Sequence, residues 1–232
     1  MIYVTGDMHG DESRLYDRYW RKLKAGDTLI ICGDFGFMWD GSRQEQQVLE
    51  YLGSRKFTVC FLDGTHENFH MLNQCRQTIW KGGKVHRVCG NLLHLMRGQV
   101  FNIDGTKIFT FGGGESLNIS DRMEQGRWWR EEFPSSAEFM EGIRNLELNA
   151  GVVDYVMTHE PPSVLKSSML LRRGKMDTVN KLGGYLEEIS RSLSFKHWYF
   201  GSMHEDRLIT PSYSAVYRKI IPVGKFPKIK KI

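Results

Sequence analysis

The sequence predicts an α/β protein in which two mixed β-sheets pack face to face and helices flank them on the outside. Three observations lead to this fold. Short apolar runs rich in β-branched and aromatic residues are typical of buried strands, and they cover residues 2–4, 29–32, 59–62, 152–156 and 198–200. Helical patterns separate the first three runs, and strand–helix–strand order predicts parallel pairing. Further short runs separated by turn residues indicate more strands in residues 85–111.

The first half of the chain contains two expected helices. Residues 12–24 place their apolar side chains on one helical face. Residues 42–53 begin with Ser42 and Glu45, which have the spacing of a capping box. These segments connect the first three predicted strands, so we expect them to act as crossover helices.

The second half begins with a predicted hairpin. Asp104 and Gly105 separate apolar residues 100–103 from residues 107–111, which is a strong hairpin signal. A long loop is expected at 112–134, a helix starting at a Ser135–Glu138 capping box, a weaker helix at 176–193, and strands within 207–223. The apolar side of the helix after Ser135 is expected at Phe139, Met140, Ile143 and Leu146.

Composition argues against a membrane-spanning or disulfide-stabilised protein. The 232 residues are 41% hydrophobic and 25% charged, and we expect a single domain over residues 1–232. No apolar run approaches the roughly 18 residues of a membrane span, and the first residues lack a signal-peptide pattern. The 4 cysteines are widely spaced, which favours reduced thiols and a cytoplasmic location. The net charge of +5 includes four lysines in a basic tail at residues 224–232, so the remaining chain is nearly neutral.

Side chains that can bind metals follow the predicted strands. They are Asp7, His9, Asp34, His66, His159 and His204. Because the carboxyl ends of parallel strands meet at one edge of a sheet, we expect these residues to converge. Mixed carboxylate and imidazole ligands suit Mn, Fe, Zn or Ni better than Ca or Mg. A shared carboxylate can bridge two ions about 3.5–4 Å apart, which is the spacing in two-metal phosphoester sites.

The order of these motifs resembles the calcineurin-like metallophosphoesterase superfamily, in a bacterial form. DxHG, GD, GTHE, TH and GSMH follow the superfamily order DxH, GD, GNH[DE], H and GHxH from Asp7 to His204. The resemblance implies a four-layer αββα sandwich with a dinuclear metal centre. It implies one ion bound by Asp7, His9, Asp34 and His204, and a second ion that shares Asp34 and adds His159. His66 is the implied catalytic residue beside the scissile phosphate, acting together with the bridging Asp34.

Two positions depart from the superfamily pattern. Thr65 stands where the pattern has asparagine, and Ser202 stands where it has histidine. Both positions are implied ligands of the second ion, so that site keeps only Asp34 and His159. A neutral hydroxyl is a weaker ligand than imidazole. We therefore expect one or two divalent transition-metal ions per chain, with manganese as the first choice and iron, zinc or nickel as alternatives.

These residues lead to three functional interpretations. The first is a metallophosphoesterase that hydrolyses a phosphate mono- or diester with metal-activated water, with activity reduced by Thr65 and Ser202. Arg122 and Arg127 are its candidate phosphate-binding residues. The second is a catalytically degenerate scaffold that acts as a binding or regulatory protein. The third is a nucleic-acid-directed protein that uses the basic tail and residues 172–175, a weaker case. The phosphoester substrate stays open, since fold alone does not define it, and no membrane partner is expected.

Overall fold

A computed structural model of the chain describes residues 1–116, 119–176 and 179–225. Its strands form two mixed sheets, which confirms the predicted α/β fold. In pairing order, the first sheet contains β13 (Ile221–Pro222), β1 (Ile2–Gly6), β2 (Thr28–Cys32), β3 (Thr58–Phe61), β6 (Leu92–Leu95), β5 (Gly83–Cys89) and β4 (Arg76–Trp80). The second sheet contains β11 (Arg207–Thr210), β12 (Tyr213–Ala215), β10 (His197–Phe200), β9 (Tyr155–Thr158), β8 (Thr106–Phe111) and β7 (Gln99–Ile103).

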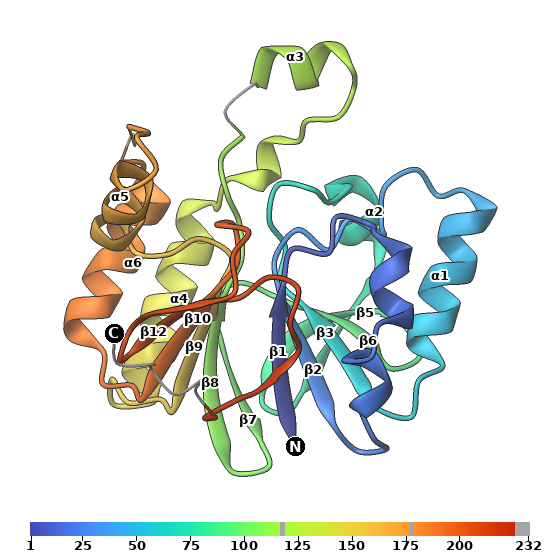
Figure 1. The fold of residues 1–232 in the computed structure, drawn as a ribbon, viewed down its shortest axis with the longest axis horizontal. Coiled ribbons are helices and arrows are strands. Elements are labelled where there is room, and N and C mark those ends of the chain that lie inside the picture. The colour runs from blue at the N-terminus through green and yellow to red at the C-terminus, as the bar shows by residue number, and fades with distance from the viewer. Residues whose placement is uncertain (117–118, 177–178, 226–232) are drawn as a thin grey trace.

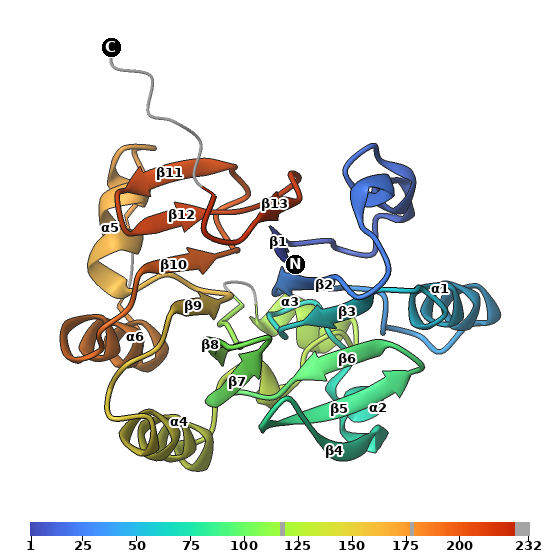
Figure 2. The same ribbon diagram turned by 90° about the horizontal axis from the view of Figure 1, so that it is seen from below.

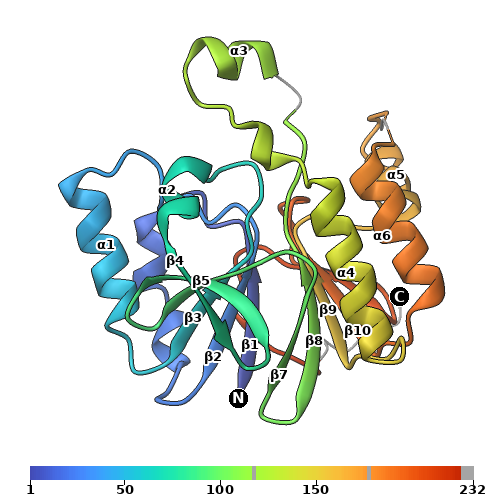
Figure 3. The same ribbon diagram turned by 180° about the vertical axis from the view of Figure 1, so that it is seen from behind.

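The described residues form six α-helices, most of which lie on the outer sides of the two sheets. They are α1 (Arg43–Gly53), α2 (Phe69–Gln74), α3 (Ile119–Glu124), α4 (Ser136–Leu148), α5 (Ser163–Leu171) and α6 (Lys181–Ser192). Figure 2 shows α1 outside the first sheet and α4, α5 and α6 outside the second. Figure 3 shows α4 and α6 running along the outer face of β8, β9 and β10. Within the described ranges, no helix is both long and apolar enough to cross a bilayer.

The central strands are buried on both faces, which places the two sheets in the middle of the molecule. In β2, Leu29 and Ile31 join the apolar cluster under α1, whereas Ile30 and Cys32 join the cluster between the sheets. This alternation follows from the two-residue period of a strand. A third cluster, which includes Trp198, lies between the second sheet and its helices. Three apolar interfaces therefore separate four layers, with helices outermost.

Parallel pairing brings the functional loops to one edge. The first sheet pairs β1, β2, β3 and β6 in parallel, and the second pairs β8, β9, β10 and β12 in parallel. The loops after β1, β2, β3, β9 and β10 therefore leave from the same edge, which is the upper edge in Figure 1. The helix α3 stands above this edge (Figure 1). The predicted 104–105 hairpin joins β7 and β8, and positive φ angles of 52° at Asp104 and 82° at Gly105 match a type I′ turn.

The predicted helix at residues 12–24 is wrong. Two short 3₁₀ helices, Glu12–Tyr16 and Trp20–Lys22, take its place. The carboxylate of Asp11 accepts from the Ser13 backbone N–H at 3.0 Å, and the Asp17 carboxylate accepts from the Tyr19 N–H at 2.9 Å. Asp11 caps the start of the first turn, whereas the Asp17 bond competes with helical backbone bonds and interrupts the helix between the two turns.

Two other expectations shift in position. The strand predicted at residues 152–156 begins at Tyr155, directly after Asp154, whose carboxylate accepts from the Lys107 N–H at 2.8 Å. The apolar side of α4 is only partly as predicted: Phe139 and Leu146 pack in the third apolar cluster, whereas Met140 and Ile143 are 57% and 39% exposed. The helix instead presents Gly142, because the backbone of Gly98 approaches so closely that a Cβ at Gly98 would lie 2.7 Å from the Gly142 nitrogen. Most of the predicted basic tail, residues 226–232, lies outside the described residues.

The capping box that begins α4 predicts a measurable contribution to stability. The Ser135 hydroxyl accepts from the Glu138 N–H at 3.3 Å, and the Glu138 carboxylate accepts from the Ser135 N–H at 2.7 Å. Ser135→Ala is expected to lower the free energy of unfolding by about 0.5–2 kcal/mol. The matched control is Ser136→Ala, at the exposed next position, which is expected to change it by less than about 0.5 kcal/mol. Equal effects in urea denaturation would show that the box contributes nothing.

Candidate metal centre

The loops at the upper edge bring the predicted site residues together. They surround a cavity of about 320 Å³. Asp7 and His9 follow β1, Asp34 follows β2, Thr65 and His66 follow β3, His159 follows β9, and Ser202 and His204 follow β10. All of these except Asp7 line the cavity, and the Asp7 side chain is buried beneath it. The two sheets therefore both contribute to one site.

The donor atoms fall into two groups that share one carboxylate. The first group contains His9, Asp34 and His204, and the second contains Asp7, Asp34 and His159; donor atoms within each group lie within 4.8 Å of one another. His9 Nε2 is 3.0 Å from His204 Nε2, and His159 Nε2 is 3.6 Å from Asp34 Oδ1. Asp7 faces both groups, with Oδ1 3.4 Å from His159 Nδ1 and Oδ2 4.0 Å from His204 Nε2.

Left-handed backbone is concentrated at this site. Among the described residues, positive φ occurs at 8 non-glycine positions, and five of them are Asp7, His9, Asp34, Ser202 and His204. Such conformations are uncommon for side chains with a Cβ and persist only where the surrounding structure holds them. Their concentration indicates that the fold positions these side chains at a cost in local stability.

Two glycines allow the ligand side chains to approach the backbone. A Cβ added at Gly33 would lie 2.0 Å from His159 Nδ1, and one at Gly64 would lie 2.2 Å from Asp34 Oδ1. Both distances are far below van der Waals contact. Glycine at these motif positions is therefore required for His159 and Asp34 to occupy their places.

The donor chemistry fits a divalent transition metal. Nitrogen and oxygen donors converge, and Asp34 belongs to both groups, as a bridging ligand must. The buried Asp7 Oδ2 accepts no hydrogen bond from the described part of the protein. A buried carboxylate oxygen without a donor is costly, and a cation would satisfy it. The converging donor atoms and the unpartnered buried oxygen are thus both features expected of a metal centre.

The electrostatics of the site keep its shared carboxylate ionised. Burial opposes the charge of Asp34, but the charge of His159 and then the hydrogen bond from His66 outweigh it, so the Asp34 pKa is well below its ordinary value. For His159, burial again opposes the charge, while Asp34 and then Asp7 raise its pKa well above the ordinary value. Asp34 is therefore an anion at neutral pH.

The two substituted positions lie at the expected place but use their hydroxyls differently. Thr65 Oγ1 lies 3.1 Å from His66 Nδ1 and donates at 3.4 Å to Asp34 Oδ1. Ser202 donates its backbone N–H to Asp7 Oδ1 at 3.1 Å, whereas its buried hydroxyl has no partner among the described residues. Thr65 is thus engaged with the catalytic candidates, and Ser202 Oγ remains uncommitted.

The two predicted phosphate-binding arginines differ in position. Both lie in residues 112–134, the segment that contains α3 and is called the arm below. Arg122 lines the cavity and donates through Nη2 to the Thr65 carbonyl at 2.5 Å. Its Nη1 contacts Ser116 Oγ and lies 3.3 Å from the Glu132 carboxylate. Arg127 is exposed and does not line the cavity.

An aromatic residue of the arm and a cation of the basic segment 172–175 support loops near the site. Trp129 packs edge-on against Trp39 at 5.2 Å between ring centroids, and it also contacts the apolar cluster under α1. Arg173, in the basic segment 172–175, donates to the Met203 carbonyl at 2.9 Å and lies 3.4 Å from Glu205. These contacts hold the arm and the loop before His204 in place.

Two supporting residues were not assigned roles from the sequence. Glu67 is fully buried and accepts from the Phe35 N–H at 2.6 Å and the Gly64 N–H at 2.7 Å, so it joins the loops after β2 and β3. Burial, followed by the charges of Asp34 and Asp63, raises its pKa to about 8. Its place in the GTHE motif is the signal that could have identified it.

Arg14 carried no sequence signal, because its contacts are long-range. Its guanidinium donates to the Gly6 and Asp7 carbonyls at 2.9 and 2.5 Å, and to the Tyr217 carbonyl at 2.6 Å. It therefore fixes the backbone that carries Asp7 against the loop between β12 and β13.

A buried pair of histidines behind the site predicts sensitivity to acid. His86 Nδ1 lies 3.0 Å from His94 Nδ1, and His94 Nε2 lies 3.0 Å from Asp63 Oδ1. Burial and then the charge of His94 lower the His86 pKa from 6.5 to about 4. The unfolded chain binds this proton more readily, so the stability is present at neutral pH and is lost as pH falls from about 6.5 towards 4.

The expected loss from His86 is about 1–2 kcal/mol between pH 7 and pH 5. Denaturation at both pH values should show a smaller loss for His86→Gln than for the unchanged protein. His70→Gln, at an exposed position in α2, is the control and should keep the full loss. The same loss in all three proteins would rule out His86 as the source.

Comparison with known families agrees with this geometry. A family model for calcineurin-like phosphoesterases matches residues 1–202, most of the chain. The chain belongs to this family, which places it among metal-dependent phosphoester hydrolases. The match ends two residues before His204. A search of curated proteins finds no match.

Proposed function

We propose that the protein hydrolyses a phosphate mono- or diester at this centre, using one or two divalent transition-metal ions. Manganese is the first choice, with iron, zinc and nickel as alternatives. The observation that carries the proposal is the convergence of two donor groups on the shared Asp34 carboxylate. The first ion would be held by Asp7, His9, Asp34 and His204. The second would share Asp34, add His159, and bind weakly because Thr65 and Ser202 offer only hydroxyls.

The residues around the metals have separate roles in this proposal. When bound, the ions supply Lewis acidity and an activated water. His66 is partly open to solvent, and its Nδ1 is held 3.1 Å from Asp34 Oδ2, so its other ring nitrogen is left to protonate the leaving group. Arg122 is a cation of the arm and lines the cavity, and its planar guanidinium suits phosphate oxygens.

Turnover with added metal tests the proposal. The purified chain with Mn²⁺ should cleave a generic aryl phosphate mono- or diester. The comparison protein is the double variant Asp34→Ala/His204→Ala, purified in the same way to exclude contaminating phosphatases. The proposal fails if Mn²⁺, Fe²⁺, Zn²⁺ and Ni²⁺ all give no turnover above this variant.

The two substituted ligands support a second candidate function, a degenerate scaffold that binds without hydrolysis. The Ser202 hydroxyl is buried and unpartnered within the described structure, and Thr65 bonds to His66, so neither is arranged as a strong ligand. Thr65→Asn/Ser202→His restores the superfamily ligands. Activity that appears only in the restored protein favours the degenerate scaffold, and equal activity before and after removes the reason for proposing it.

A further inference from the structure

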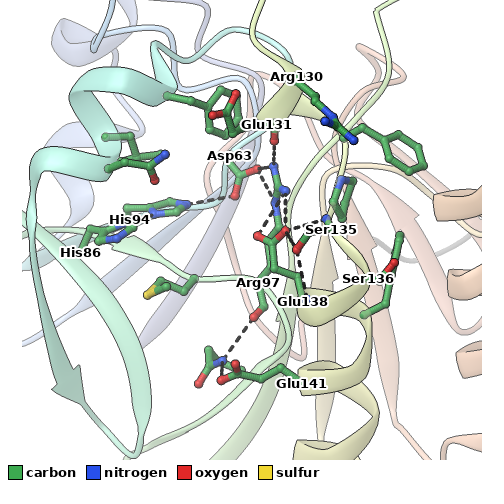
Figure 4. Close-up of a pocket in the computed structure, with 18 of the residues that line it drawn as sticks. Asp63, His86, His94, Arg97, Arg130, Glu131, Ser135, Ser136, Glu138 and Glu141 are labelled. Carbon is green, nitrogen blue, oxygen red and sulfur yellow. Dashed lines mark hydrogen bonds and ion pairs between the residues drawn. The ribbon is translucent and has the colours of Figure 1, made fainter.

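Arg97 is a buried cation that the proposed chemistry does not use. It follows β6, and its side chain is 4% exposed. It lies in the wall of a second cavity, of about 800 Å³, whose lining includes residues of α2 and α4. Figure 4 shows its guanidinium between Asp63 and Glu138, below Glu131. A buried arginine is stable only when its charge and its donors are satisfied.

The guanidinium of Arg97 joins three separate segments. Nε and Nη2 donate to Asp63 Oδ2 at 2.8 and 2.5 Å, and Nη1 donates to both oxygens of Glu138 at 3.3 Å. Nη2 also donates to the main-chain carbonyl of Glu131 at 2.7 Å. Arg97 therefore ties the end of β3 to the start of α4 and to the base of the arm.

One of these segments carries part of the metal centre. Asp63 directly precedes Gly64, Thr65 and His66. The Asp63 carboxylate also lies 3.0 Å from His94 Nε2. The main-chain carbonyl of Asp63 accepts from the Gly113 N–H at 2.9 Å. Asp63 is thus fixed on several sides, and it offers Arg97 a rigid support beside the catalytic loop.

The arm returns to the same loop at a second point. Glu132 accepts from Ser116 Oγ at 2.5 Å and pairs with Arg122 at 3.3 Å, while Arg122 donates to the Thr65 carbonyl at 2.5 Å. The contacts form a closed ring, from Asp63 through Arg97 to the base of the arm, then through Glu132 and Arg122 to Thr65. The ring therefore has two attachments to the loop after β3, one at Asp63 and one at Thr65.

We propose that Arg97 is a positioning residue that holds the arm, and through it Arg122, over the metal centre. Arg97 does not contact the cavity that contains the donor groups, so it acts only through the arm and Asp63. The effect on hydrolysis rests on the proposed function, whereas the effect on the arm does not.

Proteolysis of the native protein tests the arm without any activity assay. The arm carries exposed trypsin sites at Arg127 and Arg130. Lysine at position 97 keeps the charge but cannot reach all three partners, so Arg97→Lys should speed cleavage in the arm by about tenfold. The matched control is Lys84→Met, which removes a 2.7 Å ion pair to Glu141 beside the same cavity but touches neither Asp63 nor the arm. The control should leave arm cleavage unchanged.

Kinetics then show whether Arg97 acts through Arg122. Arg97→Lys and Arg122→Ala should each lower kcat/KM by about ten- to a hundredfold, and the double variant should lose no more than Arg122→Ala alone. Additive losses, or unchanged arm cleavage in Arg97→Lys, would overturn the proposal. Absence of turnover in the unchanged protein would reject the proposed function, while arm cleavage would still decide the role of Arg97.

A variant at the partly exposed partner covers the case in which Arg97→Lys does not fold. Glu138→Gln removes one charge that faces Arg97 and should speed arm cleavage by about threefold. Circular dichroism and a cooperative unfolding transition identify folded variants. Unchanged arm cleavage in a folded Glu138→Gln protein would also overturn the proposal.

Discussion

Asp34→Asn is expected to lower kcat/KM for an aryl phosphate by at least about a thousandfold, which corresponds to about 4 kcal/mol in transition-state free energy. Asp34 is the carboxylate common to both donor groups, so its loss affects both ions. In the unsubstituted protein, Asp34 Oδ1 accepts from the Thr65 N–H at 2.6 Å. Asparagine keeps the size of the side chain and an oxygen that can still accept this hydrogen bond. The expected loss is therefore one of charge and metal binding, with the fold retained.

Steady-state kinetics at saturating Mn²⁺, together with metal content, measure this effect. Asp40→Asn is the control, because Asp40 is an exposed carboxylate in a loop of the same sheet and belongs to neither donor group. It should keep kcat/KM within about twofold of the unchanged protein. If Asp34→Asn retains both turnover within about tenfold and its full metal content, Asp34 is not a bridging ligand.

His66→Gln is expected to lower kcat by about 10²–10⁴-fold for an alkyl phosphate, and by much less for a nitrophenyl phosphate. An alkoxide is a poor leaving group that needs a proton, whereas nitrophenolate leaves without one. The His66 side chain is 44% exposed, and its Nδ1 is held by Asp34 and Thr65 at 3.1 Å each. This arrangement fixes the ring while leaving its other nitrogen open to the substrate.

The measurement compares kcat for the two leaving groups at saturating Mn²⁺. His70→Gln, an exposed histidine four residues along the chain, should leave both values unchanged. Equal losses for the alkyl and the nitrophenyl ester would contradict proton donation by His66. They would assign it to charge stabilisation on the phosphate instead.

The fold was largely predictable, and so was the convergence of the candidate ligands, because both follow from local patterns. Buried strands such as β2 are short apolar runs, and strand–helix–strand order determines parallel pairing. Parallel pairing then places Asp34 and His159 at one edge, although they are 125 positions apart in the sequence. The division of ligands was less predictable, since the Asp7 carboxylate faces both donor groups.

Other features were not predictable, because they depend on contacts between distant segments. The helical period of residues 12–24 gave no sign that Asp17 would bond to the local backbone and interrupt the helix. Periodicity placed Phe139 and Leu146 correctly on the buried side of α4, but it does not report the close approach of Gly98 to Gly142. Arg97 carries no motif, and its role depends on partners 34 and 41 residues away.

The supporting contacts explain why Arg122 and Arg127 have different positions despite their similar sequence setting. Arg122 is held by Thr65 and Glu132, so the arm places it in the cavity lining. Arg127 lies beyond α3 and is exposed. Phosphate binding is therefore proposed for Arg122, while Arg127 serves as a site at which the arm can be cleaved.

Metal content per chain is the most direct measurement of the central proposal. The protein should be loaded with Mn²⁺, desalted and measured by elemental analysis beside the Asp34→Ala/His204→Ala variant. We predict one retained ion per chain in the unchanged protein, a second ion only when free Mn²⁺ is kept in excess, and none in the variant. No retained metal in the unchanged protein, or equal metal in both proteins, would contradict a metal centre formed by Asp7, His9, Asp34 and His204.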